Sequence, residues 1–266
     1  MKKALFLCLS ICWLQAPPAF AQKLNSLYVV FGGSMPTGNF SGTNPESIFT
    51  YREDGSNPSF QGFVKKDNGY AQPGFQVSAG GLVGIFPKLI LDAGFGMATF
   101  GVETQGVSEH MTDVYRRFAM FHDFPEIQIR QKDYQVWYTR IGLLYPIRTG
   151  NFELLAGPSL GWSFLNFPDY DVLTFSTMQA SETPNRTFRH TAEKPTPNSL
   201  VLGFKSSLMY QLSPKVNVGL NAEYLKADFK YTTALDYLEG EGSMGPFQDK
   251  INFRTFLVGF MCQYDL

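Results

Sequence analysis

Residues 152–165, FELLAGPSLGWSFL, alternate between two kinds of side chain. The even-numbered residues are apolar and mostly large, whereas most odd-numbered residues are small or polar. A period of two is the pattern of a β-strand with two different faces, since apolar residues on one face of a helix recur about every 3.6 positions. The stretch therefore predicts a strand that separates an apolar from a polar environment.

Seven further segments show strand patterns: 27–34, 75–85, 89–101, 134–145, 200–212, 216–224 and 255–266. The connections between the eight segments alternate in length. Short turns at 87–88, 148–151 and 213–215 are interleaved with long loops at 36–71, 103–132, 166–198 and 232–250. This alternation is typical of outer-membrane barrels. The sequence therefore predicts an all-β fold, an eight-stranded antiparallel transmembrane β-barrel with short periplasmic turns and long extracellular loops.

The N-terminus has the features of an export signal. Lys2 and Lys3 precede an apolar run at 4–14, and the sequence at 19–21 is Ala-Phe-Ala. A charged start, a short apolar run and an A-x-A site predict a signal peptide at 1–21, cleaved to leave a barrel domain at 22–266. We expect the mature protein in the bacterial outer membrane. Its only cysteine would be Cys262, which excludes an intramolecular disulfide.

Several short motifs resemble a known family. YVVFG at 28–32, followed by PTGNF at 36–40, resembles the first strand and its exit in the outer-membrane β-barrel family common in Bacteroidetes, whose barrels are eight-stranded and OmpA/OmpX-like. Segments 74–84 and 253–266 resemble the second and last strands of that family. The resemblance spans nearly the whole mature chain and implies architecture and location. It implies no activity, because most members have no assigned biochemical role.

The polar faces of the predicted strands carry a candidate lumen charge network, Asp92, Arg140, Glu153, Lys205 and Glu223. A turn centred on Pro214 places Lys205 opposite Glu223, so we expect these two to interact. One interpretation is a structural plug of the lumen, and the other is a small ion path. Eight strands leave too little width for a general pore.

The histidines raise the possibility of an enzyme that modifies lipid A or phospholipid. They lie in predicted loops without a recognisable catalytic signature: His110 beside Ser108 and Glu109, His122 beside Asp123, and His190 near Ser181 and Glu182. We therefore predict no enzyme, no catalytic residue, no cofactor and no metal site. The basic loop stretches YRRF at 115–118 and RTFR at 186–189 either contact lipopolysaccharide phosphates or a partner protein, or form an ordinary solvated rim.

Three functions remain open on the sequence. The first is a structural or surface-interaction barrel whose extracellular loops carry the function. The second is the lipid-modifying enzyme, and the third is a soluble periplasmic barrel with an apolar ligand-binding interior. For the first, we expect outer-membrane lipids and lipopolysaccharide as partners, the barrel-assembly machinery during insertion, and a monomer. The net charge of −1 gives no reason to expect nucleic acid.

Overall fold

A computed structural model describes residues 25–43, 69–86, 88–109, 112, 126–166, 170–175, 186–192, 196–237 and 243–266. The predicted signal peptide at 1–21 lies outside the described residues. In the described part of the chain, no helix is long and apolar enough to cross a membrane.

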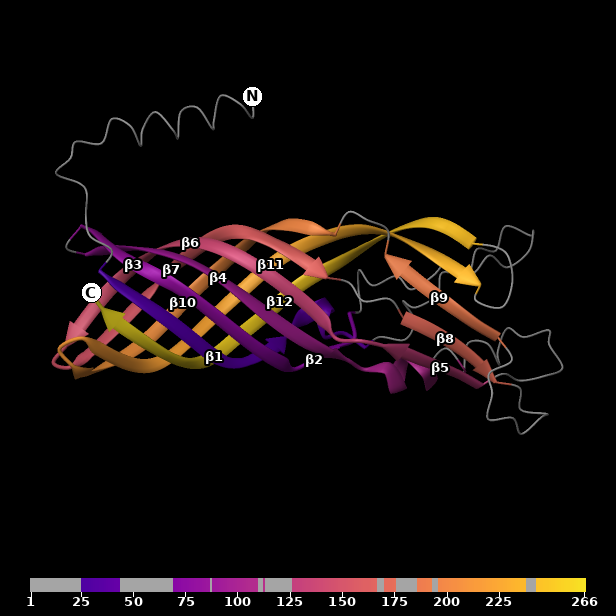
Figure 1. Ribbon diagram of the computed structural model, residues 1–266, viewed down its shortest axis with the longest axis horizontal. Coiled ribbons are helices and arrows are strands. Elements are labelled where there is room, and N and C mark those ends of the chain that lie inside the picture. The colour runs from indigo at the N-terminus through magenta and orange to yellow at the C-terminus, as the bar shows by residue number, and fades with distance from the viewer. Residues whose placement is uncertain are drawn as a thin grey trace, which may run out of the picture.

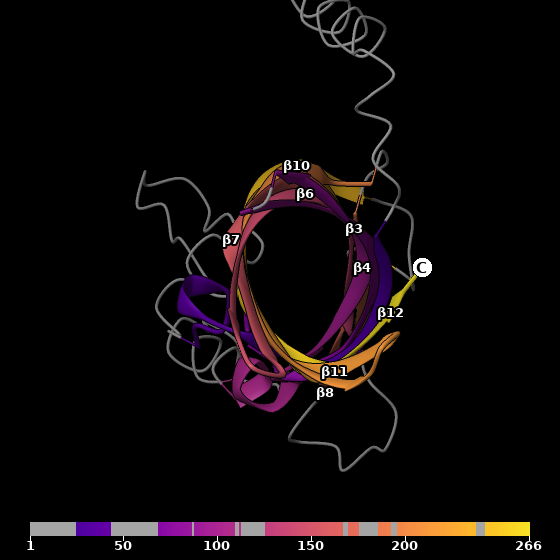
Figure 2. The ribbon, with the colours of Figure 1, turned by 90° about the vertical axis from the view of Figure 1, so that its left-hand side faces the viewer.

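Eight antiparallel strands form a closed ring (Figure 2). They are β1 (Ser26–Pro36), β3 (Gly74–Phe86), β4 (Leu89–Val102), β6 (Tyr134–Thr149), β7 (Phe152–Asn166), β10 (Asn198–Ser213), β11 (Val216–Tyr237) and β12 (Ser243–Asp265). Each strand pairs with the next, and β1 closes the ring by pairing with β12 from Ser26↔Asp265 to Pro36↔Thr255. The predicted eight-stranded antiparallel barrel is confirmed.

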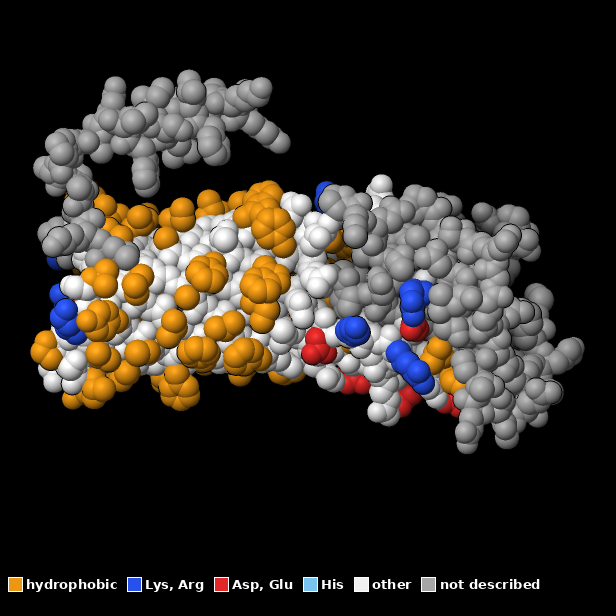
Figure 3. Space-filling view, viewed as in Figure 1, with side chains coloured by type: hydrophobic (Ala, Val, Ile, Leu, Met, Phe, Trp, Pro, Cys, Tyr) orange, Lys and Arg blue, Asp and Glu red, His pale blue; other side chains and the backbone are white. Residues whose placement is uncertain are grey.

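The two faces of the ring differ as the alternation predicts. Ser159 is buried in the lumen, whereas its neighbour Leu160 points outward and is 51% exposed. Large apolar side chains, including Trp137, Trp162 and Phe260, are exposed around the outer face. On the face seen in Figure 3, hydrophobic side chains are spread over the barrel half of the molecule. An apolar exterior around a closed backbone ring is the solution that a lipid bilayer requires. It also contradicts the soluble-barrel alternative, which needs a polar exterior.

The prediction of long loops is partly wrong, because all four of these segments contain strand residues. β11 and β12 extend beyond the predicted ends at 224 and 255, and three short strands lie in the other segments: β5 (Glu126–Gln131), β8 (Tyr170–Phe175) and β9 (Arg186–Ala192). They pair in the order β11–β9–β8–β5 and extend the barrel at one end (Figure 1). We call these three strands, with 226–237 of β11 and 243–254 of β12, the platform. The first long segment contributes β2 (Ala71–Gln72), which pairs with β4.

The upper parts of β11 and β12 were not predicted because their apolar side chains change from the outer to the inner face of the sheet. Up to Tyr224 the apolar side chains of β11 point outward, whereas Leu225, Ala227 and Phe229 are buried on the inner side. The strand itself continues without interruption through this point. The reversal marks the level at which the surroundings of the outer face change from lipid to water.

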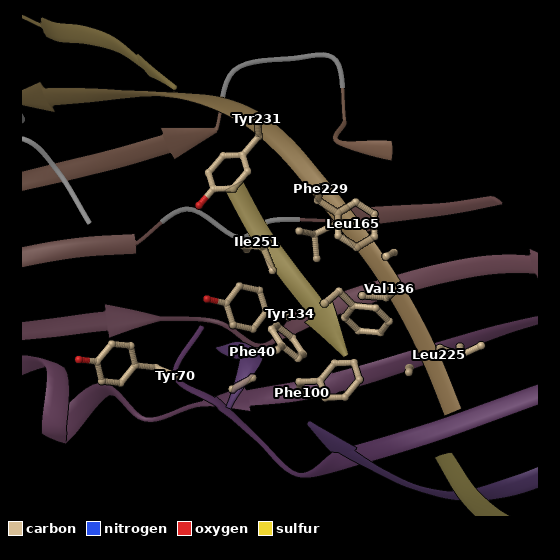
Figure 4. Packing of buried hydrophobic residues seen from close by; sticks show 14 of the residues in the cluster. Phe40, Tyr70, Phe100, Tyr134, Val136, Leu165, Leu225, Phe229, Tyr231 and Ile251 are labelled. Carbon is tan, nitrogen blue, oxygen red and sulfur yellow. The ribbon is translucent and has the colours of Figure 1, made fainter. Parts of the chain in front are cut away.

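The lumen is filled at both ends. At the platform end, Phe40 on the 3-10 turn Gly38–Phe40 inserts among rings from several strands, at centroid distances of 5.1 Å from Phe100 and 5.2 Å from Phe253 (Figure 4). We call this buried cluster, with Tyr134 and Phe229, the outer plug. A second apolar cluster, which includes Leu82, Leu144, Leu155, Met209 and Met261, lies towards the short turns.

Candidate functional site: a charged belt inside the barrel

Four charged side chains lie inside the barrel between the two apolar clusters. Asp92 on β4, Arg140 on β6, Lys205 on β10 and Glu223 on β11 are each at most 3% exposed. All four lie at inward positions of the two-residue alternation. Burying a charge is unfavourable unless it is paired and hydrogen-bonded, so the contacts between these groups decide what the site can do.

Asp92 is the centre of the cluster. Tyr28 on β1 donates its hydroxyl to Oδ1 of Asp92 at 2.7 Å. Lys205 Nζ donates to Oδ2 at 3.0 Å, and Arg140 Nη1 forms an ion pair with the same oxygen. Arg140 Nη2 also donates to the Tyr28 hydroxyl, at 3.1 Å. Asp92 therefore connects its own strand, β4, to β1, β6 and β10.

Arg140 links Asp92 to the second carboxylate. Its Nε lies 2.8 Å from Oε1 of Glu223. Lys205 Nζ is 3.9 Å from the centroid of the Tyr28 ring, a cation–π distance. We call Tyr28, Asp92, Arg140, Lys205 and Glu223 the charged belt. Two cations balance two anions in it, so the belt places no net charge in the lumen.

The predicted register is confirmed, but the closest ion-pair partners of Lys205 and Glu223 are other residues. Lys205 lies directly opposite Glu223 in the β10–β11 ladder. Lys205 nevertheless pairs with Asp92, and Glu223 pairs with Arg140. In a narrow barrel, long inward side chains reach the middle of the lumen, where they meet residues from strands that are not their neighbours.

Three inward glycines leave room for the belt and for the tyrosine next to it. A Cβ atom at Gly80 would lie 2.4 Å from the Tyr28 hydroxyl, and one at Gly94 would lie 2.7 Å from it. A Cβ atom at Gly96 would lie 2.5 Å from the hydroxyl of Tyr138. Such distances are far below van der Waals contact, so these positions exclude any side chain while the tyrosines keep their places.

Glu153, the fifth predicted member, does not join the belt. It lies one residue into β7, beside the β6–β7 turn, and its Oε1 pairs with Arg148 Nε at 2.6 Å. The Arg148 side chain is 74% exposed, so this is a surface ion pair. Tyr28, in contrast, belongs to the belt although the sequence did not indicate it, because the segment 27–34 is apolar on both faces and its inward side was not assigned.

The other predicted candidates lie away from the lumen or outside the described residues. His110, His122, Asp123 and the stretch 115–118 are outside them, as are Ser181 and Glu182. His190 lies on β9, opposite Leu235 of β11. Arg189, a candidate phosphate contact, donates two hydrogen bonds to the carboxylate of Asp171 on β8, at 2.8 and 3.2 Å. Within the described ranges, no three His, Cys, Asp or Glu residues are grouped so that they could hold a metal ion.

Comparison with known proteins finds likeness in structure but none in sequence. No family model matches the chain, and no curated protein matches it. The fold is similar to that of OprG from Pseudomonas aeruginosa (12% identity, 92% of this chain and 98% of that chain, TM-score 0.46). It is also similar to Neisserial surface protein A (8%, 91% and 96%, 0.42) and to the outer membrane protease OmpT from Escherichia coli (10%, 95% and 99%, 0.42).

The described residues themselves define the architecture. The strand ring is closed, its outer face is apolar, and its interior charges are paired. These are the features of an eight-stranded antiparallel transmembrane β-barrel, the form in which proteins span the bacterial outer membrane.

Proposed function

We propose that this chain is a non-enzymatic, monomeric surface-interaction protein of the outer membrane, in which the barrel is an anchor and the platform is the interacting part. The observation that carries the proposal is the continuation of β11 and β12 beyond the apolar outer face to join β9, β8 and β5. Strands that continue into water and recruit three more strands build a rigid support, which a barrel that only spans the membrane does not need.

The filled lumen supports an anchor over an ion path. The outer plug and the inner apolar cluster both fill parts of the lumen, and the charged belt shares Tyr28 with the inner cluster. An ion entering the lumen would have to displace buried aromatic rings and then separate paired charges. Each of these steps is unfavourable, and a belt without net charge attracts neither cations nor anions.

The outermost edge of the platform is protected against strand addition. β5 pairs only with β8 among the described strands. Residues 104–109 and 112, which precede β5, are helical. Two backbone N–H groups on β5 donate to hydroxyls of these residues, Ile127 N to Thr112 Oγ1 at 3.0 Å and Ile129 N to Ser108 Oγ at 2.9 Å. Capping an edge in this way prevents indiscriminate pairing with other chains. We infer that a partner contacts the faces and connecting segments of the platform and does not add a strand at β5.

Several finer points belong to the same proposal. We propose export by a cleaved signal peptide at 1–21, insertion of the barrel at 22–266 by the barrel-assembly machinery, and contact with outer-membrane lipids and lipopolysaccharide. The motifs at 28–32 and 36–40 support membership of the Bacteroidetes-type outer-membrane barrel family. The two alternative functions are not proposed, because no described residue provides a nucleophile–base pair and the exterior is apolar.

Two measurements on the full chain test the proposal. Purified protein in planar bilayers should give no discrete current steps in 1 M KCl, where a porin from the same preparation conducts. Cells that display the protein should be retained on an array of surface glycans and proteins, and replacing 167–197 by a short turn should abolish retention while heat-modifiable folding persists. Stable channels would overturn the proposal. Equal retention of cells that display the wild type and cells that display the 167–197 replacement would also overturn it.

A further inference from the structure

The outer face of the β11–β12 hairpin carries a compact group of charges immediately beyond the apolar region. The ladder pairs its members in three rows: Lys226↔Arg254, Asp228↔Asn252 and Lys230↔Lys250. We call these six residues the basic grid. All have even numbers, and even-numbered side chains point outward on both strands, as the exposed Leu220 and Phe260 show. The grid holds four basic side chains and one carboxylate.

Two rows of the grid place like charges directly opposite each other. Lys226 faces Arg254, and Lys230 faces Lys250, an arrangement that destabilises a strand pair. The single carboxylate, Asp228, pairs with Lys250 at 3.4 Å. Nε of Arg254 is buried and has no hydrogen-bond partner among the described residues. Within the grid, four cations thus face one carboxylate, and this excess of positive charge is one that an anion from outside can neutralise.

The position of the grid indicates where that anion comes from. Tyr224 and Phe256 lie one outward step below the Lys226↔Arg254 row, with ring centroids 5.0 Å apart. Among the side chains that the structure describes on β11 and β12, they are the last outward aromatic residues, and aromatic residues mark the border between acyl chains and headgroups. The grid thus begins at headgroup level. Figure 3 shows the same order on the visible face, with charged side chains appearing where the hydrophobic cover ends.

Three other strands, β6, β7 and β10, do not carry cations among their last outward residues at this border. On β6 and β7, the outward residues beyond Trp137 and Phe164 are Gln135 and Asn166, which pair with each other. On β10, the outward residue beyond Leu200 is Asn198. The positive charge on β11–β12 is therefore not shared by β6, β7 and β10.

We propose that the basic grid binds the phosphates of an outer-leaflet glycolipid whose acyl chains pack against the apolar side chains below. The two like-charge rows are four residues apart, or about 13 Å along the strands, so they suit two phosphates carried on different sugars of one headgroup. Lysine and arginine bind phosphate through charge-assisted hydrogen bonds. Continuity with the lipid-facing surface favours a membrane lipid over a free anion. This inference rests on the lipopolysaccharide contact proposed above and specifies it, and it does not depend on what β5, β8 and β9 of the platform bind.

Native mass spectrometry of the full chain in detergent tests the inference. The probes are bisphosphorylated lipid A, the same glycolipid without phosphates, phosphatidylglycerol and inorganic phosphate. The wild type should retain the bisphosphorylated glycolipid in preference to the other three. The double variants Lys226→Gln/Arg254→Gln and Lys230→Gln/Lys250→Gln should each bind it about tenfold more weakly, since each basic group near an anionic surface contributes several-fold in affinity.

The control variant is Arg148→Gln/Lys215→Gln, which removes two exposed cations at the opposite end of the barrel and should bind like the wild type. Heat-modifiable migration on a gel verifies that every variant is folded. Undiminished binding by both grid variants would overturn the proposal. Equal retention of the dephosphorylated glycolipid would show that phosphate is not recognised, and equal retention of phosphatidylglycerol or inorganic phosphate would rule out a glycolipid site.

Discussion

Neutralising Asp92 should destabilise the barrel strongly. Asp92→Asn keeps the size of the side chain but removes the charge that Lys205 contacts at 3.0 Å and that Arg140 also contacts. The belt would then hold two buried cations and one carboxylate, Glu223. Removing one partner of a buried ion pair costs about 3–5 kcal/mol, and Asp92 serves two cations. We therefore expect a loss at the upper end of that range.

Urea unfolding in phospholipid vesicles measures this loss, with fluorescence from the lipid-exposed Trp137 and Trp162 as the signal. Lys205→Met should also destabilise the barrel. The double variant Asp92→Asn/Lys205→Met should lose much less than the sum, because Arg140 and Glu223 remain as a neutral pair.

A second double-mutant cycle tests two residues that lie opposite each other in the ladder but have other ion-pair partners. Lys205→Met and Glu223→Gln should also be non-additive, but with a smaller coupling energy, since Lys205 faces Glu223 in the ladder and pairs with Asp92. A loss below about 1 kcal/mol for Asp92→Asn, or strict additivity of Asp92→Asn and Lys205→Met, would refute this account of the belt.

Three further changes test the two faces and the plug. Leu160→Arg should destabilise the barrel by about 2–4 kcal/mol, because the side chain points into lipid, and should lower the folded fraction seen on heat-modifiable gels. Leu160→Met should fold normally. Gly80→Ala should cost about 1–3 kcal/mol in urea unfolding by displacing Tyr28, whereas Gly33→Ala, whose Cβ would meet nothing closer than 3.7 Å, should be nearly neutral. Phe40→Ala should cost about 3–5 kcal/mol in the same assay, since its ring is buried in the outer plug; an unchanged midpoint would mean that the plug contributes little.

The membrane-spanning part of the fold was predictable because lipid and lumen impose opposite demands on successive residues. In residues 152–165 this alternation is nearly complete, and the inward position of Ser159 and the outward position of Leu160 follow from it. The alternation reverses at Tyr224, where the outer face enters water. The upper part of β11 therefore does not continue the apolar-out alternation of the lower part. For this reason the strand was predicted to end at 224, although it runs to Tyr237.

The belt was predictable only in part. Alternation assigns a residue to a face, so it placed Asp92, Arg140, Lys205 and Glu223 in the lumen. It does not give depth along the barrel, which is why Glu153, beside a turn, was grouped with them. Nor does it give contacts across the lumen, because these depend on how eight strands are arranged around the ring.

The orientation of the barrel in the membrane is the central claim, and epitope tags on intact cells test it most directly. Tags at Gly55, Glu182 and Glu239 fall in the predicted long loops 36–71, 166–198 and 232–250, and a tag at Thr149 falls at the end of β6, beside the β6–β7 turn. All four proteins should first be shown to fold by heat-modifiable migration. Antibody should label the first three on intact cells and the Thr149 tag only after the outer membrane is permeabilised. Labelling of the Thr149 tag on intact cells, with the Glu239 tag hidden, would contradict the account.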